Sequence, residues 1–411
     1  MPEFPCRACG APVSQSVVDL GEQPLANSYR SAEDDPAAEP RYPLHPHVCE
    51  SCWLVQLPEV ATPDEIFSDY AYFSSFSDSW LAHARAYADQ IVDKLGLDAE
   101  SHLVEVASND GYLLRRFVER GIPAIGIEPA QNVAAEAERQ GVPTERFFLG
   151  AETARGFVAK HGQADLVVAN NVMAHVPDLN DFIAGLALLV ADTGTLTIEV
   201  PHLLRLVEET EFDTIYHEHF SYFSLLTARD VLSRHGLTVV DCEELPSHGG
   251  SLRIYARHGG SPSERVAEIE ARERAGGLTD LEGYASFRDR VAAVRRDLLT
   301  FLETARGEGR SVAAYGAPAK GNTLLNYCGV GTDLIAYTVD RSPHKQGHLL
   351  PGSGLPIDPP DRIFETRPDY VLILPWNLAR EITVQMAAIA EWGGRFVVPI
   401  PMVQVLAAPV G

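Results

Sequence analysis

The sequence predicts an α/β protein built from a small zinc module with four cysteine ligands, a central seven-stranded Rossmann-like domain with a terminal antiparallel hairpin, and a second Rossmann-like α/β domain. Three observations support this prediction. Two CxxC pairs lie close to the start of the chain, a strand–helix alternation follows from about residue 103, and a second alternation begins near residue 311. Roughly 100–200 residues per domain make 411 residues enough for two or three cores.

The charge balance limits the classes of partner. The chain has 33 Lys and Arg against 57 Asp and Glu, a net charge of −24, which argues against general nucleic-acid binding because no basic face is available for phosphates. The sequence contains no run of about 18 apolar residues, the length that a membrane-spanning helix needs. The first ten residues lack the basic and then apolar pattern of a signal peptide, so we expect a cytoplasmic protein.

The cysteines predict a structural zinc site. Four of the six form the pairs Cys6/Cys9 and Cys49/Cys52, and in a reducing compartment such pairs favour thiolate ligands over disulfides. Zn²⁺ prefers a tetrahedral shell of four thiolates, which leaves no open position for catalysis. Two alternatives remain: one pair could be a redox motif, or a nearby histidine, His45 or His47, could replace a cysteine.

We expect four segments along the chain: a zinc module over 1–75, a cofactor domain over 76–260, a helical connector over 261–309 and a C-terminal α/β domain over 310–411. Apolar residues at helical spacing predict a helix over 79–95. The expected strands of the cofactor domain are 103–107, 124–128, 165–170 and 195–200, with helices over 112–120, 133–140 and 182–190. A hairpin of 237–244 and 251–257 is expected at an antiparallel edge of the sheet.

The remainder of the chain predicts a connector followed by a second sheet. The stretches 261–275 and 281–308 are polar and helical, with an apolar stripe that includes Phe287, Val291, Val294 and Leu298. Expected strands of the second domain are 311–315, 334–339, 370–374 and 395–399, with a helix over 378–392.

The turn after the first strand of the central domain is the predicted cofactor site. Ala107, Asn109 and Gly111 alternate there, where a tight turn in a doubly wound fold needs small or αL-tolerant residues. Glu128 ends the next strand, 17 residues after Gly111, where an acid accepts hydrogen bonds from ribose hydroxyls. The missing three-glycine pattern, the acid Glu105 inside the strand and the terminal hairpin favour S-adenosylmethionine over NAD.

Several motifs in one order resemble a known family. They are the four cysteines, the stretch 69–78, the turn 105–111, the stretch 170–175, the stretch 216–219, the stretch 248–253 and the stretch 316–321. Together they resemble the three-domain, zinc-containing sugar C-methyltransferases, which methylate a ring carbon of nucleotide-linked keto-deoxysugars. The resemblance implies that the middle domain binds S-adenosylmethionine, with Tyr112, Asn170 and Asn171 among its contacts, and that the C-terminal domain helps to hold the nucleotide-sugar.

The stretch 216–219 and His175 are the predicted catalytic groups. Both are expected beyond strand ends of the cofactor domain, where ligands bind in open α/β sheets. In an extended chain His217 and His219 would face opposite sides, so one of them meets substrate, and the family places its base at His219. A base must remove a proton beside the sugar carbonyl before carbon can take a methyl group, and Tyr216 and His175 would donate to the enolate oxygen. Glu218 would orient His219 or bind the sugar.

The substrate contacts rest on weaker patterns. The aromatic stretch 69–78 offers hydroxyls and rings, although it could equally anchor the zinc module. His248 and Arg253 lie in the motif of the hairpin, while Lys320 opens a helix where phosphate binds well and Arg341 adds positive charge. From the stretch 69–78 the predicted contacts are Tyr70, Tyr72, Ser74 and Ser75.

The expected function is therefore S-adenosylmethionine-dependent C-methylation of a nucleotide-linked 4-keto-deoxysugar, with C3 favoured and C5 the alternative. An O- or N-methyltransferase, an NAD-dependent nucleotide-sugar oxidoreductase and a non-catalytic zinc-dependent scaffold are the competing hypotheses. We expect a nucleotide-sugar as partner, no nucleic acid and no membrane, and a monomer in preference to an oligomer.

Overall fold

The computed structural model describes residues 3–60 and 78–407, and the chain folds into two compact units. The first consists of Met1–Ser14, Cys49–His202 and Phe220–Ala275. The second consists of Gln15–Val48, Leu203–His219 and Gly276–Gly411. The chain thus passes between units several times, and each unit is described by itself. The four-segment division predicted from the sequence stays a prediction.

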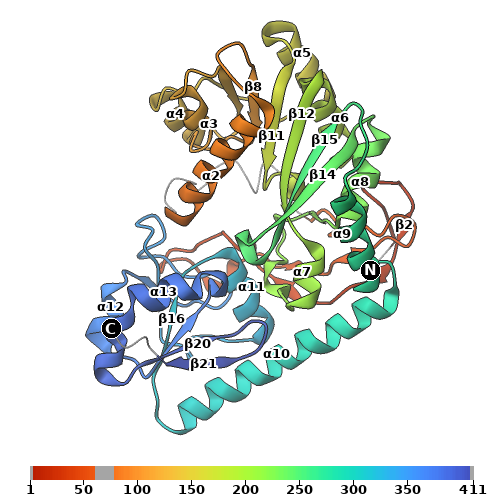
Figure 1. The fold of residues 1–411 in the computed structure, drawn as a ribbon. Helices are drawn as coiled ribbons and strands as arrows, with labels where there is room; N and C mark the ends of the chain where they lie inside the picture. Colours follow the sequence, from red (N-terminus) through yellow and green to blue (C-terminus); the bar gives the residue numbers. More distant parts are fainter. Residues whose placement is uncertain (1–2, 61–77, 408–411) are drawn as a thin grey trace. The chain divides into compact units, whose positions relative to one another are not determined.

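The first unit is built on a seven-stranded sheet of order β10-β9-β8-β11-β12-β15-β14 (Figure 1). Counting only strands that run parallel, this is the Rossmann order 3-2-1-4-5-6, as predicted. The strands are β8 (Leu103–Val106), β9 (Ala124–Ile127), β10 (Thr144–Glu145), β11 (Ala164–Asn170), β12 (Val190–Pro201), β14 (Thr238–Leu245) and β15 (Ser251–Arg257).

The predicted terminal hairpin is present, but its place in the sheet differs from the expectation. Strand β15 is antiparallel to both β12 and β14 and lies between them, so the edge strand β14 runs parallel to the rest. The reason is that the chain passes through helix α8 (Leu225–Arg234) before it forms β14 at the edge, and then turns back to form β15 between β12 and β14. The antiparallel strand is therefore internal, and its residues Leu252, Ile254 and Ala256 are fully buried.

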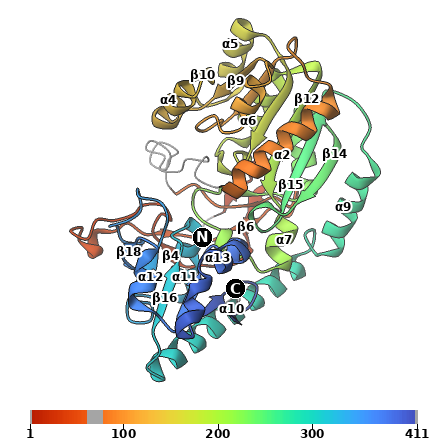
Figure 2. The same ribbon diagram turned by 60° about the vertical axis from the view of Figure 1, so that its left-hand side comes forward.

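Helices cover both faces of this sheet, which explains why its strands are apolar on both sides. Successive strand residues enter different cores: Leu103 packs in one cluster and Val104 in the other. One face carries α2, which lies across β12 and β15 in Figure 2, together with α3 and α4. The helices of this unit are α2 (Asp78–Leu95), α3 (Leu114–Val118), α4 (Gln131–Arg139), α5 (Ala151–His161), α6 (Leu179–Leu189), α8 (Leu225–Arg234) and α9 (Glu264–Ala275), with short 3₁₀ turns η3 (Met173–His175) and η5 (Ser247–Gly249).

The N-terminal part of the first unit is rich in turns. Its two short strand pairs are β1 (Phe4–Pro5) with β2 (Pro12–Val13), and β7 (Val55–Gln56) with β13 (Ser221–Tyr222). Both pairs are antiparallel and only two residues long, and β7 and β13 belong to a four-stranded sheet of very short strands. Other constraints, described below, must fix its conformation.

The second unit contains a six-stranded sheet of order β18-β17-β16-β19-β20-β21, again the Rossmann order, with only β21 antiparallel. Its strands are β16 (Val312–Tyr315), β17 (Thr338–Val339), β18 (Ile357–Asp358), β19 (Tyr370–Ile373), β20 (Arg395–Val398) and β21 (Gln404–Ala407). The predicted strand over 334–339 shortens to the last two residues. The predicted helix over 378–392 divides into an α-helix and a 3₁₀ segment that tightens towards the left-handed cap Gly393.

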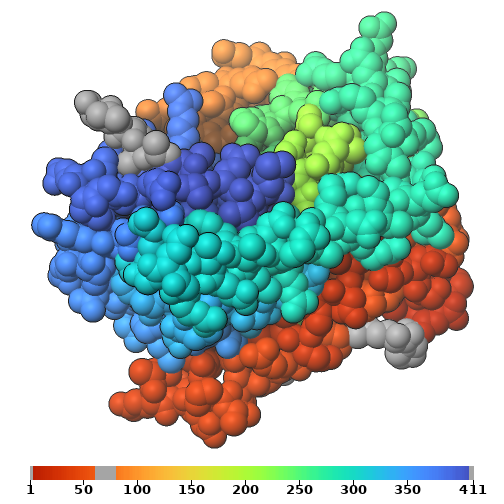
Figure 3. Space-filling model, turned by 90° about the horizontal axis from the view of Figure 1, so that it is seen from below, coloured from red at the N-terminus to blue at the C-terminus, as the bar shows by residue number. Residues whose placement is uncertain are grey.

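Helix α10 (Leu281–Gly307) lies within the segment 261–309 that the sequence predicts as a connector, whereas α9 of that segment belongs to the first unit. Its buried residues include Phe287, Val291, Val294 and Leu298, which confirms the apolar stripe, and Figure 3 shows the helix in teal along the molecular surface. The other helices of the second unit are α7 (Leu203–Glu208), η4 (Phe212–Thr214), α11 (Ala319–Cys328), α12 (Asp361–Thr366), η6 (Trp376–Leu378), α13 (Ala379–Gln385) and η7 (Ala387–Trp392).

The segment between the two cysteine pairs belongs to this second unit. It forms β3 (Gln15–Ser16), β4 (Glu22–Gln23), η1 (Pro36–Ala38), β5 (Tyr42–Pro43) and β6 (His47–Val48). In the residues that the structure describes, no helix combines the length and apolarity that crossing a bilayer requires.

Candidate active site

The four predicted zinc ligands converge in the first unit. The Sγ atoms of Cys6, Cys9, Cys49 and Cys52 all lie within 4.8 Å of one another, with Cys6 3.5 Å from Cys52 and Cys9 3.6 Å from Cys49. A tetrahedral shell with Zn–S bonds of about 2.3 Å places sulfurs about 3.8 Å apart, so the donor set fits Zn²⁺. The alternative in which a histidine replaces a cysteine is not needed.

Local backbone geometry explains how each CxxC pair presents its sulfurs. Gly10 and Trp53 follow the two pairs, adopt left-handed φ values of 75° and 63°, and each donates its N–H to the carbonyl of the first cysteine of its pair. The Gln56 amide also donates to Cys6 Sγ at 3.1 Å. The hydrogen bond with Cys52 lowers the pKa of the Cys6 thiol to about 4, which favours the thiolate that a metal binds.

Arg7 connects this cysteine cluster to the rest of the first unit. Its guanidinium donates to the carbonyl oxygens of Pro177, Phe220 and Leu57 at 2.8–3.1 Å. Pro177 follows the 3₁₀ turn η3 that contains His175. The conformation of the cysteine turn and the position of the His175 loop are therefore linked.

The predicted cofactor turn has the expected conformation. Ala107, Asn109 and Gly111 have positive φ values of 55°, 51° and 76°. A Cβ on Gly111 would lie 3.0 Å from Val142, so glycine is also required by packing. Glu128 accepts from the Asn109 N–H and the Ala130 N–H, both at 2.9 Å, so this predicted ribose acid also fixes the turn.

Buried polar atoms without partners lie on the strands next to this turn. Among the described residues, Glu105 Oε2, Asn170 Oδ1 and Asn171 Oδ1 accept no hydrogen bond. Glu105 and Asn170 lie near the carboxyl ends of the adjacent strands β8 and β11, from which the chain leaves in opposite directions across the sheet. Ligands of open α/β folds bind at this switch point, and a polar ligand with amino and hydroxyl groups fits these orphaned acceptors.

Electrostatics add a charge preference to this switch point. Burial raises the pKa of Glu105 well above its ordinary value, and nearby Asp110 and Glu128 raise it further. The side chain is 1% exposed. A cationic group placed against it would compensate this cost, which makes Glu105 the residue best suited to face a positively charged ligand.

Next to the turn, α2 contributes an aromatic cluster that the sequence did not reveal as part of the site. Trp80 stacks on His83 with ring centroids 4.9 Å apart, and Tyr112 and His248 lie 6.0 and 5.1 Å from Trp80. His248 has a left-handed φ of 58° in the hairpin turn. This contact places the predicted substrate residue His248 on the same side as the cofactor residue Tyr112.

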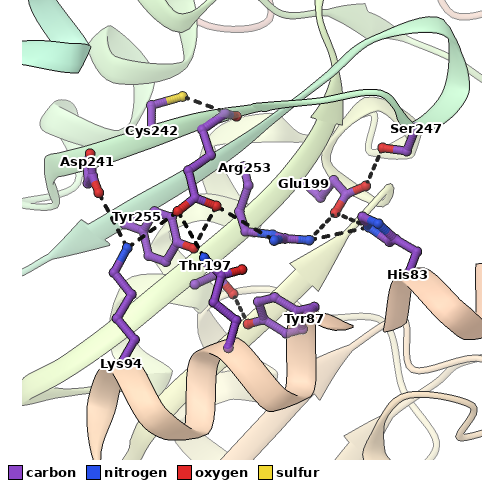
Figure 4. A network of polar contacts seen from close by, with 12 residues as sticks. His83, Tyr87, Lys94, Thr197, Glu199, Asp241, Cys242, Ser247, Arg253 and Tyr255 are labelled. Atoms are coloured by element: carbon purple, nitrogen blue, oxygen red, sulfur yellow. Dashed lines mark hydrogen bonds and ion pairs between the residues drawn. The ribbon is translucent and has the colours of Figure 1, made fainter. Parts of the chain in front are cut away.

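A polar network beneath this cluster involves Arg253 (Figure 4). Its guanidinium bonds Glu199 at 3.0 Å and lies over the Tyr87 ring, and His83 and Ser247 bond the same carboxylate at 2.9 and 2.8 Å. Burial alone would raise the pKa of Glu199, but the His83 and Arg253 contacts lower it overall. Arg253 is 3% exposed, so these internal bonds account for it and the substrate contact stays a prediction.

Glu199, which the sequence did not single out, is the centre of this network. It is a fully buried acid near the end of β12, and that position was the signal that could have identified it.

In the second unit, Tyr216, His217, Glu218 and His219 form a turn and not an extended segment. The His219 N–H donates to the Tyr216 carbonyl at 2.9 Å. The turn follows η4 instead of a strand, which corrects the predicted context, and Thr323 Oγ1 holds it through the Ile215 carbonyl at 2.9 Å.

The turn brings Tyr216 and His219 together. The Tyr216 hydroxyl lies 2.7 Å from His219 Nε2, and His219 Nδ1 lies 3.1 Å from the Thr214 carbonyl oxygen. A carbonyl oxygen only accepts, so Nδ1 carries the hydrogen and Nε2 has the lone pair in the neutral ring. His219 is thus arranged as a base whose basic nitrogen accepts from a phenol.

The neighbouring histidine has a different environment. His217 is 3% exposed, its ring packs edge-on against Tyr42 at 6.0 Å, and burial lowers its pKa. The family resemblance favours His219 over His217 as the base, and these surroundings are consistent with a packing role for His217.

Glu218 is held by a residue from the distant segment Gln15–Val48. The Asn27 amide donates to Glu218 Oε1 at 2.6 Å, and burial raises the pKa of Glu218 to about 7. Tyr29 and Lys345 both donate to the Ala317 carbonyl, at 2.7 and 2.8 Å. No sequence pattern singled out Asn27 or Tyr29.

The two cationic residues predicted to bind phosphate differ in their surroundings. Lys320 donates to Asn377 at 2.9 Å and lies over the Trp376 ring at 4.3 Å, while burial lowers its pKa and Asp213 and Glu211 raise it. Lys320 therefore has internal partners that the sequence did not indicate. Arg341 is exposed. The predicted contacts Tyr70, Tyr72, Ser74 and Ser75 lie outside the described residues.

The first unit therefore has the fold and switch point of a Rossmann-like cofactor-binding protein, and comparison with known proteins defines its class further. Residues 80–241 match a family described as a methyltransferase domain, residues 6–67 a putative zinc binding domain, and residues 246–401 a C-methyltransferase C-terminal domain. The C-methyltransferase NovU of Streptomyces niveus is 39% identical over 406 residues, which cover 98% of this chain and 97% of that protein. The chain belongs to the C-methyltransferase family, whose members are enzymes that methylate carbon.

Two solved methyltransferase structures are similar to a part of the chain. Magnesium protoporphyrin IX methyltransferase from Synechocystis PCC 6803 with bound SAH is 15% identical with a TM-score of 0.34, over 47% of this chain and 90% of that one. An S-adenosylmethionine-dependent methyltransferase from Clostridium acetobutylicum ATCC 824 is 10% identical with a TM-score of 0.33, over 43% and 91%.

Proposed function

We propose that this enzyme transfers a methyl group from S-adenosylmethionine to a ring carbon, C3 in preference to C5, of a nucleotide-linked 4-keto-deoxysugar. The observation that carries the proposal is the Tyr216–His219 pair, because it supplies the base that carbon methylation needs. Membership of the C-methyltransferase family favours carbon over oxygen or nitrogen as the acceptor, and methyl transfer over the NAD-dependent alternative.

The unpartnered acceptors of the first unit are suited to the cofactor. The polar groups of the cofactor would bind to Glu105, Asn170 and Asn171. Glu128, which is bonded to the Asn109 N–H, would accept hydrogen bonds from the ribose hydroxyls. When bound, S-adenosylmethionine supplies an electrophilic methyl group on a positively charged sulfur.

Tyr216 and His219 would remove one proton from the sugar carbon. Because Nδ1 of His219 donates to Thr214, Nε2 is the site that takes the proton, and the Tyr216 hydroxyl already points at it. The phenol oxygen accepts the proton from the carbon beside the sugar carbonyl while its own proton passes to Nε2. The products are an enolate, a neutral Tyr216 and an imidazolium, so Tyr216 remains a hydrogen-bond donor next to the new negative charge.

The zinc ion has a structural role in this proposal. Four thiolates close its coordination shell, and the turn that carries them is tied through Arg7 to the His175 loop. Zinc would therefore support the position of His175, which we propose as a second donor to the enolate oxygen.

The proposal is tested by solvent exchange without the methyl donor. The enzyme is incubated in D₂O with thymidine and uridine diphosphate 4-keto-6-deoxysugars, and NMR follows the hydrogens beside the carbonyl. Exchange at C3 or C5 identifies the carbon that is activated, and product NMR after addition of the donor identifies the carbon that is methylated. Failure of every sugar to exchange, with normal binding of the donor, would contradict the proposal.

A further inference from the structure

The contact between Asn27 and Glu218 joins two parts of the chain that are 191 residues apart. The amide nitrogen donates to Glu218 Oε1 at 2.6 Å, and since an amide NH₂ is only a donor, the bond favours a carboxylate over a carboxylic acid. Glu218 is 6% exposed, whereas Asn27 is exposed. An exposed residue therefore donates directly to a buried carboxylate.

The backbone on both sides of Asn27 is fixed to α11 and to loops of the second unit. The carbonyl of Ala26 accepts from the buried Asn322 amide at 2.5 Å, and the Tyr29 hydroxyl donates to Ala317 at 2.7 Å. Arg30 exchanges two backbone hydrogen bonds with Leu349, at 3.1 and 2.8 Å. These anchors hold Asn27 in position independently of its own side chain.

Asn27 and the charged groups around Glu218 act on its carboxyl in different ways. On the packed elements Lys345 is the cation that acts on the Glu218 carboxyl, and the phenol of Tyr29 lies near both. On its own turn, Glu218 is flanked by His217 and His219 and follows Tyr216. Lys345 donates to the Ala317 carbonyl and acts on Glu218 through its charge, whereas Asn27 acts through a direct hydrogen bond that fixes the carboxyl in orientation.

We propose that Asn27 is a positioning residue that orients the carboxyl of Glu218, which lies on the same turn as Tyr216 and His219, and holds it in the ionised form during the proton transfer. An ionised Glu218 is the counter-charge for the imidazolium that His219 becomes, whereas a neutral carboxyl would lose that role. Burial raises the pKa of Glu218 to about 7, so its charge changes near neutrality, and the hydrogen bond from Asn27 favours the ionised form there. This inference rests on the proposed function for its catalytic part only.

The experiment reads the carboxyl directly and the reaction separately. Protein labelled with ¹³C at the glutamate carboxyls is titrated by NMR, and the Glu218 signal is identified by its absence in Glu218→Gln. Loss of a hydrogen bond to a charged group in Asn27→Ala should move the titration midpoint upward by roughly one to two pH units. In Asn27→Asp a second carboxylate faces the first, and the midpoint should rise further.

The reaction is followed in the same variants through the pH profile of solvent deuterium exchange into the keto-sugar nucleotides. The acidic limb should move upward with the NMR midpoint, while the affinity for S-adenosylmethionine stays within about twofold. The matched control is Ser28→Ala, which removes the exposed hydroxyl next in the chain and should change neither quantity.

The outcomes separate the two proposals. An NMR midpoint that moves without any exchange in the wild type would support the positioning role and contradict the proposed function. An unchanged midpoint in folded Asn27→Ala, or a rate that falls without a shift of its pH profile, would overturn the positioning role.

Discussion

The hydroxyl of Tyr216 and Nε2 of His219 lie 2.7 Å apart, and the carbonyl of Thr214 fixes the hydrogen of the imidazole on the opposite nitrogen. This arrangement makes the two side chains one acid–base unit. Its proton acceptor is already hydrogen-bonded before substrate arrives, so the first proton movement occurs along an existing bond.

We predict that His219→Asn lowers kcat for methyl transfer by roughly 10²–10⁴ because it removes the acceptor nitrogen. Tyr216→Phe should cause a loss of the same order, since it removes the relay while the ring still packs. Steady-state kinetics and deuterium exchange measure both effects, and calorimetry should show nearly unchanged binding of S-adenosylmethionine. The matched control is His348→Ala, an exposed histidine of the same unit. Full exchange in His219→Asn would assign the base elsewhere.

The parts of the fold that were predictable depend on local patterns. Apolar runs bounded by turn residues identified β8, β9, β11 and β12 within a few residues, because burial on both faces of a parallel sheet leaves a continuous apolar signature. The alternation of small residues identified the Ala107–Gly111 turn, because positive φ restricts the residue types. The internal place of β15 was not predictable, since strand order depends on pairings between distant segments.

The parts of the site that were missed depend on long-range pairings. Asn27 has no local feature that distinguishes it, and its role comes from the anchoring of Ala26 and Tyr29 on α11 and on the loop that precedes it. Likewise, the partners of Lys320 come from η4 and η6. A lysine at the start of a helix has the same sequence pattern whether it faces phosphate or a buried carboxylate.

Binding of the cofactor should release a proton through Glu105. Burial, together with Asp110 and Glu128, raises the pKa of its carboxyl well above the ordinary value, and a cationic ligand placed beside it would lower that pKa and favour ionisation. Affinity should therefore increase as pH rises towards that pKa. Calorimetry with S-adenosylmethionine at pH 7, in two buffers of different ionisation enthalpy, measures the release.

Glu105→Gln should abolish this proton release and weaken binding by roughly tenfold, because it removes a hydrogen bond to a charged group. The exposed Glu100→Gln serves as the control for loss of one acidic charge. Equal proton release in Glu105→Gln and the wild type would place the titrating group elsewhere.

Lys320→Met should destabilise the second unit. Burial raises the pKa of Asp213 to about 6 although Lys320 and a 2.7 Å bond from Trp376 oppose this, so removal of Lys320 leaves the carboxylate without its cation. Because Lys320 is partly exposed, we expect a loss of about 1–3 kcal/mol in the free energy of unfolding at pH 7.5, less than for a fully buried pair.

The sign of the pH effect identifies the cause. The pKa of Asp213 is higher in the folded protein than in the unfolded chain, so its contribution to folding stability is complete below its ordinary pKa. That contribution is lost as the pH rises through about 6. The deficit of Lys320→Met should therefore shrink at pH 5, as urea unfolding at both pH values would show. Arg341→Met, an exposed cation of the same unit, should change stability by less than about 0.5 kcal/mol. A variant of full stability with a strongly raised KM for the nucleotide-sugar would instead support the phosphate contact predicted from the sequence.

Removal of zinc should unfold the cysteine turns and loosen the loop of His175. The strands of this region are only two residues long, so we expect the free energy of metal binding to contribute substantially to its stability. Cys49→Ser should reduce the zinc content from one ion per chain and lower the melting temperature, whereas Cys328→Ala, a buried cysteine outside the cluster, should keep the metal. X-ray absorption of the wild type should show four sulfurs at about 2.3 Å. Because Arg7 bonds the Pro177 carbonyl, zinc loss should also increase amide hydrogen exchange at residues 173–178. If exchange there stays constant while residues 6–9 become accessible, the cysteine cluster stabilises only its own turns and has no part in the position of His175.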